Sequence, residues 1–73
     1  MAKKGKDAVY RVIDVVGTSP TSWEEAARSA VRTASKSLRD LRIAEVVKLD
    51  VRVENGKVTA FRTRLSLSFK YEG

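Results

Sequence analysis

The chain has 73 residues, enough for one domain, and carries 15 Lys and Arg against 9 Asp and Glu, which gives a net charge of +6. It contains no Cys and no His, which excludes disulfides, zinc sites of the Cys/His type, and thiol or imidazole catalysis. A domain this small buries a modest share of its surface, so oligomerisation is the expected source of additional stability.

Residues 1–7 are expected to form a disordered basic tail, because they are Lys-rich and lack large apolar side chains. The folded domain is expected over residues 8–73. The chain has no run of roughly 18 to 20 apolar residues, and no apolar signal core follows the tail. We therefore expect a cytoplasmic protein.

The first predicted element is a strand from Val9 to Val16, rich in β-branched residues and apolar on both faces. Gly17 is expected to let the chain leave this strand sharply, and Pro20 to prevent strand pairing from continuing.

A capping box marks the start of the only predicted helix, from about Trp23 to Leu41. The Ser22 hydroxyl can accept from the N–H of Glu25, and the Glu25 carboxylate can accept from the N–H of Ser22. One apolar stripe follows the helical period: Trp23, Ala27, Ala30, Ala34, Leu38 and Leu41. A basic stripe follows the same period: Arg28, Arg32, Lys36 and Arg39. The basic stripe is either a solvated face or a surface for phosphate groups or RNA.

Two further strands are predicted, from about Ile43 to Val53 and from about Lys57 to Tyr71, joined by the turn Glu54-Asn55-Gly56. The predicted fold is therefore α+β, in the order β-α-β-β, with a three-stranded antiparallel sheet packed on one helix. One helix cannot cover strands this long, which favours self-assembly.

The register of the hairpin follows from matching its apolar faces. A three-residue loop ending at Gly56 pairs Val53 with Lys57 and keeps the apolar faces together. A two-residue loop pairs Val53 with Val58 and mixes the faces. We therefore expect the three-residue loop, or a bulge at the glycine.

Two acidic residues stand among apolar neighbours and are the candidate site residues. Glu45 falls at an inward position between Ile43 and Val47, where a carboxylate needs a partner or a ligand. The partner is expected to be an arginine such as Arg62 or Arg64. Asp14 is either a calcium ligand or a partner of backbone groups near the Gly17 turn.

Several segments together resemble the dodecin family, and the resemblance covers nearly the whole predicted domain. The matching segments are Val9 to Pro20, Ser22 to Ala26, Ala44 to Val46, Asn55 to Val58, Phe61-Arg62 and Ser68 to Lys70. The resemblance implies a non-enzymatic subunit whose sheet wraps its helix, assembled into a hollow homododecamer. It also implies flavin storage, with stacked flavin pairs at subunit interfaces.

The two family positions that contact flavin differ in this chain. Ile43 stands where the family has a Trp that stacks on the isoalloxazine ring, and Arg62 stands where it has a Gln that hydrogen-bonds the ring edge. An aliphatic side chain removes the aromatic stacking, and a guanidinium cannot accept a hydrogen bond. The expected site is therefore a degenerate flavin pocket of Ile43, Glu45 and Arg62.

The same departures resemble a branch of the family, the calcium dodecins, which implies calcium as ligand. The resemblance does not assign the metal ligands, and Asp14 is the candidate ligand on its chemistry alone, because hard oxygen ligands suit calcium. The leading hypothesis is a self-assembling, non-enzymatic protein with weak or absent flavin binding. Riboflavin or FMN binding, with Arg62 stacking on the ring or pairing with phosphate, is the first alternative. A small basic RNA-binding domain is the second. An enzyme using Glu45 as a base beside Arg62 is least favoured.

Overall fold

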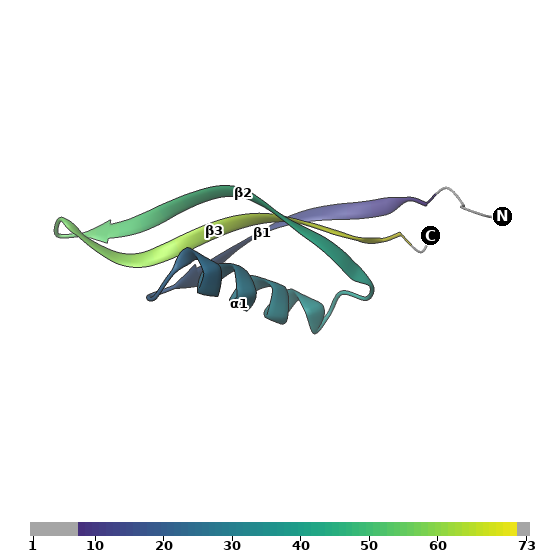
Figure 1. Cartoon of the computed structure of the whole chain (residues 1–73), viewed down its shortest axis with the longest axis horizontal. Coiled ribbons are helices and arrows are strands. Elements are labelled where there is room, and N and C mark those ends of the chain that lie inside the picture. Colours follow the sequence, from purple (N-terminus) through teal and green to yellow (C-terminus); the bar gives the residue numbers. More distant parts are fainter. Residues whose placement is uncertain (1–7, 72–73) are drawn as a thin grey trace.

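The computed structural model describes residues 8–71, so the tail expected over residues 1–7 lies outside the described residues. Four elements follow one another: β1 (Tyr10–Ser19), α1 (Trp23–Ser35), β2 (Leu41–Glu54) and β3 (Lys57–Lys70) (Figure 1). The strands form one antiparallel sheet in the order β1-β3-β2, with α1 on one of its faces. The predicted β-α-β-β architecture is confirmed.

The first strand runs further than its sequence indicates, and Gly17 has a different role from the one predicted. Gly17 does not end the strand, because it pairs with Thr63 and the ladder continues to Ser19. A Cβ atom at Gly17 would lie 2.1 Å from the Ala26 carbonyl oxygen and 2.9 Å from the Ala30 Cβ. Glycine is therefore required at this position because α1 crosses β1 at backbone contact.

The helix is shorter than predicted and ends at Ser35 rather than Leu41. Half of the capping box forms, since the Ser22 hydroxyl accepts from the Glu25 N–H at 3.0 Å. The Glu25 carboxylate lies instead 3.8 Å from Arg28. The helix ends earlier than predicted because Leu41 already belongs to β2, where it pairs with Phe69. The chain must therefore turn between Ser35 and Leu41, and Asp40, with a φ of 57°, lies in this turn.

The β2–β3 turn is a two-residue loop, so the predicted three-residue loop is wrong. Asn55 and Gly56 have φ angles of 53° and 75°, and Val53 pairs with Val58. Two positive φ angles suit the right-handed twist of a hairpin. The apolar faces still meet because a register shift between Arg52 and Val53 restores their parity, after which Val51 pairs with Phe61.

A second register shift, between Val46 and Lys48, changes which residues of β2 face the helix. Leu49 and Val51 lie on the face that packs on α1, which we call the inner face. On the other side of the shift, Ala44 takes this inner position, opposite Leu67. Strict alternation along the predicted strand would place Ile43, Glu45 and Val47 on the same face as Leu49 and Val51, and this is wrong because one extra residue reverses the alternation.

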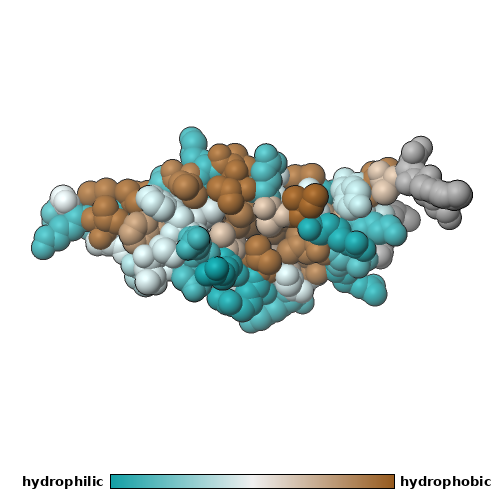
Figure 2. Space-filling model, in the orientation of Figure 1, coloured by the Kyte–Doolittle hydropathy of each residue, from teal (hydrophilic) through white to brown (hydrophobic). Residues whose placement is uncertain are grey.

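The core of the subunit is small for the length of its strands. Its buried apolar side chains are Ala26, Leu65 and Leu67, and Thr63 is buried beside them. The radius of gyration is 15.5 Å, against about 11 Å for a compact chain of this length. Figure 2 accordingly shows apolar side chains spread along the surface beside the charged side chains of the helix.

Candidate binding face of the sheet

The four predicted site residues lie together on one face, although not in the inward positions expected for some of them. We call this the outer face, the side of the sheet away from α1. Asp14 of β1, Ile43 and Glu45 of β2, and Arg62 of β3 belong to it, as their ladder partners show. Ile43 is 62% exposed, and Asp14 and Glu45 are exposed. The inward position predicted for Glu45 is therefore wrong, and the cause is the bulge after Val46.

Asp14 and Glu45 are the two ends of one row across the sheet. Ser66 of the central strand pairs with Asp14 on one side and with Glu45 on the other. Adjacent strands are roughly 4.8 Å apart, so the two carboxylate-bearing backbones are roughly 10 Å apart. We call this set the acidic row. It presents two carboxylates and a hydroxyl group, which are hard oxygen donors.

Arg62 is held by Asp50 rather than by Glu45. Its Nε donates to Asp50 Oδ1 at 2.8 Å, and its Nη2 donates to Asp50 Oδ2 at 3.4 Å. The two residues face one another directly across β2 and β3. The predicted ion pair of Glu45 with Arg62 or Arg64 does not form within the subunit. A guanidinium engaged by two carboxylate oxygens is also poorly placed to stack on a ring or to bind phosphate.

Trp23 fastens the start of α1 to the hairpin. Its indole Nε1 donates to the Asp50 carbonyl oxygen at 2.9 Å, and its ring packs edge-on against Phe61 with the centroids 5.1 Å apart. The Thr63 hydroxyl donates to the Trp23 carbonyl oxygen at 2.9 Å. The indole is therefore committed to structure and does not replace the aromatic face missing at Ile43.

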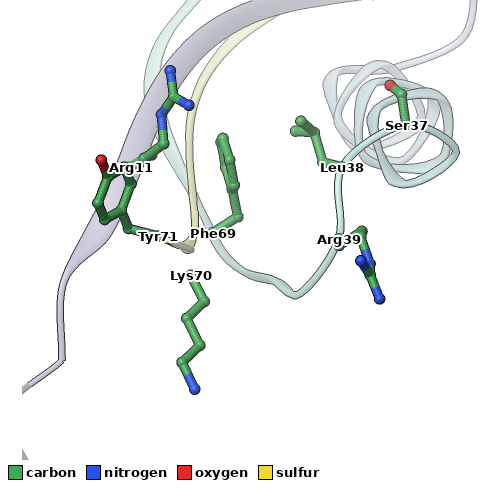
Figure 3. Close-up of a pocket in the computed structure, with 7 residues that line it drawn as sticks. All are labelled: Arg11, Ser37, Leu38, Arg39, Phe69, Lys70 and Tyr71. Carbon is green, nitrogen blue, oxygen red and sulfur yellow. The ribbon is translucent and has the colours of Figure 1, made fainter. Parts of the chain in front are cut away.

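The predicted site residues line none of the three most clearly formed hollows of the described surface. One, of about 230 Å³, lies between Leu38 and Phe69, whose side chains point toward one another in Figure 3. Three cationic residues border it, and in Figure 3 the Arg11 side chain extends upward whereas those of Arg39 and Lys70 extend downward, apart from one another. The cations therefore do not converge on one anion.

The largest of the three hollows, of about 530 Å³, is an apolar groove between α1 and β2. Its floor includes Val31, Val46 and Leu65, and Arg28 and Arg32 border it. Sequence reasoning missed this groove, because Val46 was placed on the wrong face of β2. The third hollow, of about 280 Å³, lies between α1 and the end of β1.

The basic stripe is shorter than the sequence indicates. Arg28 and Arg32 lie on α1, but Lys36 caps the helix and Arg39 belongs to the loop that follows. Arg28 also lies close to Glu25. The described helix therefore does not present the four-residue basic face on which the RNA-binding alternative depends.

Between residues 8 and 71, no helix is long and apolar enough to cross a membrane. Over the same residues, no group of three or more acidic, His or Cys side chains is close enough to hold a metal ion. The acidic row of one subunit, with its two carboxylates, falls short of such a group.

Comparison with known proteins finds a family model and relatives that agree with one another. The sequence model of the family described as Dodecin matches residues 9–72. A protein named calcium dodecin, from Mycobacterium tuberculosis (strain ATCC 25618 / H37Rv), is 52% identical over 64 residues, covering 86% of this chain and 89% of the relative.

Solved structures agree in fold. The crystal structure of the Mycobacterium tuberculosis calcium dodecin, described as a calcium-chelating immunodominant antigen with a novel calcium-binding site, has a TM-score of 0.79 at 48% identity, covering 89% of this chain and 93% of that one. A dodecin from Streptomyces coelicolor has a TM-score of 0.85 at 38% identity, covering 100% of this chain and 99% of that one.

Proposed function

The chain belongs to the dodecin family, a family of small binding proteins that assemble as oligomers, and from that premise we propose that it forms a hollow homododecamer that binds calcium in place of flavin. The proposed protein is non-enzymatic. A cytoplasmic location stays a prediction from the sequence.

The observation that carries the proposal is the mismatch between core and apolar surface. Within residues 8–71, three apolar residues are buried, whereas twelve large hydrophobic residues are exposed. Burying one Val or Leu side chain stabilises a protein by roughly 1.5–3 kcal/mol, so the isolated subunit forgoes much of its available stability. Assembly supplies the missing burial, and the exposed edges of β1 and β2 can be covered in the same way.

The calcium assignment is supported by the acidic row and by the relative. Calcium takes six to eight oxygen ligands, and Asp14, Glu45 and Ser66 supply three oxygen-bearing side chains. One subunit does not complete that number, so the remaining oxygens would come from water or from further copies. The named calcium dodecin, at 52% identity, supports a cation as the ligand of this chain as well.

The test is a calorimetric titration of calcium into metal-free protein, wild type against Asp14→Asn. We expect wild-type binding at or below millimolar calcium, and binding at least tenfold weaker in Asp14→Asn. Asp50→Asn is the matched control, because it removes a carboxylate from the same face that is already paired with Arg62. No wild-type binding would refute the calcium assignment, and unchanged binding by Asp14→Asn would remove Asp14 from the site.

Flavin binding is the second candidate, and the structure offers it little support. Its ring position is occupied by the aliphatic Ile43, and the Arg62 guanidinium is engaged by Asp50. Riboflavin fluorescence should therefore stay unquenched at micromolar protein. Strong quenching under those conditions would favour flavin over calcium as the ligand.

A further inference from the structure

The turn Asn55-Gly56, at the tip of the β2–β3 hairpin, holds the only side-chain amide in the sequence, which has one Asn and no Gln. Both residues are exposed, and Figure 1 shows the tip of the hairpin extending past α1. A Cβ atom added at Gly56 would meet no other atom within 4 Å. Open space therefore adjoins the turn in the described subunit.

The hydrogen bonds of the hairpin stop on either side of this turn. The last pairs of the ladder are Val53 with Val58 and Glu54 with Lys57, so the Gly56 N–H lies outside it. Among residues 8–71, the side-chain hydrogen bonds likewise leave out Asn55. Neither the Asn55 amide nor the Gly56 nitrogen is therefore held by another group in the described part of the chain.

The backbone of the turn is close to the conformation in which these two groups can bond. Asn55 and Gly56 have φ angles of 53° and 75°, both positive as in a type I′ turn. Attack of the Gly56 nitrogen on Asn55 Cγ closes a five-membered ring. A planar ring eclipses the Asn55 Cβ with that nitrogen, which for an L-residue sets ψ at about −120°, the value in the first central residue of a type II′ turn.

One peptide rotation separates the observed turn from the closing one. A type II′ turn keeps the positive φ at its first central residue and has a negative φ at its second, a change that glycine tolerates. Both types are standard two-residue hairpin turns, so the strands stay paired. An Asn with an ordinary negative φ lacks this route, because a ψ near −120° then lies outside the allowed regions.

We propose that Asn55 is a site of spontaneous deamidation in the folded protein, with the Gly56 nitrogen as the nucleophile. That nitrogen bonds to Asn55 Cγ, the Cγ–Nδ2 bond breaks, and ammonia leaves, taking up the Gly56 N–H proton through water. The product is a succinimide. Water then adds to one ring carbonyl and breaks its bond to the Gly56 nitrogen, which gives aspartate or isoaspartate. The net change is one water consumed and one ammonia released.

The two products differ in what they do to the hairpin. Aspartate keeps the turn, because Asp-Gly also suits a type I′ turn. Isoaspartate carries the main chain through Cβ and Cγ, which adds one backbone atom to a two-residue loop whose length determines the register. Either product adds a negative charge beside Glu54. The isoaspartyl form should therefore lose the terminal pairing of Glu54 with Lys57.

The experiment follows ammonia release and intact mass of the full chain during incubation at mildly alkaline pH. Each event reports Asn55, because the sequence has no other side-chain amide. The same chain in guanidinium chloride supplies the rate of a flexible Asn-Gly. The folded protein should react no more than about tenfold slower than the denatured one, because its turn samples the closing conformer as a minor state. A larger slowing would show that the native turn protects Asn55 and would overturn the proposal.

The matched control is the swap Asn55→Gly/Gly56→Asn, which keeps the composition and the two residues that tolerate positive φ. It places Asn before Lys57, which pairs with Glu54 in the ladder. The folded swap should release ammonia at least about tenfold more slowly than the wild type, because a nitrogen engaged in the ladder is not available for attack. An equal rate in the folded swap would rule out Gly56 as the nucleophile.

Asn55→Asp replaces the swap if circular dichroism shows that the swap is unfolded. It keeps the turn and has no amide to lose, so its ammonia release should vanish. Release equal to that of the wild type would exclude Asn55 as the source. These results do not depend on the proposed self-assembly or on calcium, because the step uses one chain and water alone.

Discussion

Gly17 lies where the helix comes closest to the sheet, and its replacement gives the sharpest prediction at the scale of one residue. A methyl group at Gly17 would lie 2.1 Å from the Ala26 carbonyl oxygen, so Gly17→Ala must push the helix away from β1. We expect a loss of roughly 1–3 kcal/mol in the free energy of unfolding, the usual cost of overpacking. Urea denaturation at one fixed protein concentration measures it.

Thr18→Ala is the control for Gly17→Ala, because Thr18 is the next residue along β1 and is exposed. Its effect should stay within about 0.5 kcal/mol. If Gly17→Ala were equally mild, the close crossing of α1 and β1 would be incorrect.

Ile43 and Arg62 give a second residue-scale prediction, based on the family positions that they occupy. Ile43→Trp/Arg62→Gln replaces both side chains that depart from the flavin-binding pattern. An indole restores aromatic stacking worth roughly 0.5–1.5 kcal/mol per pair, and an amide restores a hydrogen-bond acceptor. Riboflavin fluorescence should then be quenched by the variant and not by the wild type.

Ile43→Leu/Arg62→Gln is the matched control for this gain of binding, because it removes the guanidinium without supplying an aromatic ring. Quenching by this control would show that Arg62 alone prevents flavin binding. Quenching by neither variant would mean that the outer face is not the flavin-binding surface.

At the scale of single elements, the sequence predicts most of what local chemistry decides. The order β-α-β-β and the Ser22 cap are confirmed, because β-branched runs and capping residues act over a few neighbours. The C-terminal end of α1 and the faces of β2 were not predictable. They depend on pairing with β3, since Leu41 pairs with Phe69 and one extra residue after Val46 reverses the alternation.

The candidate site was also predictable only in part, because its residues could be identified from the sequence but their partners could not. The sequence indicates Asp14, Ile43, Glu45 and Arg62, and the structure places all four on the outer face. Their partners could not be predicted, because strict alternation puts Glu45 inside and leaves Asp50 as ordinary surface. The acidic row depends on three strands, and its pairing through Ser66 becomes visible only with the register of both ladders.

Deletion of Val47 tests the bulge. Val46 pairs with Leu65 and Lys48 pairs with Arg64, so removal of the residue between them leaves a continuous ladder in which Glu45 keeps its outer position. Deletion of Leu49 instead reverses the alternation and turns Lys48 toward the inner face, where an unpaired charge is unfavourable. We expect the Leu49 deletion to cost at least about 2 kcal/mol more in unfolding free energy than the Val47 deletion. Thermal denaturation of the two variants compares them, and equal stability would show that Val47 is not an extra residue in the ladder.

At the scale of the whole molecule, calcium binding and assembly are expected to be linked. The proposed calcium site belongs to the assembled particle, because one subunit does not supply the oxygen ligands that calcium takes. A ligand that binds the assembled state more tightly than the separated copies shifts the equilibrium toward assembly. Millimolar calcium should therefore lower the protein concentration needed for assembly, as measured by sedimentation velocity in calcium and in chelator. Weaker assembly in calcium would contradict this linkage.

The proposed assembly depends on the mismatch between a small core and a long, apolar sheet, which one helix does not cover. The mass of the native particle in dilute solution tests it most directly. Sedimentation equilibrium of the full chain should give about 97 kDa, twelve copies of 8.1 kDa, with no folded monomer. A well-folded particle of 8.1 kDa would contradict the account.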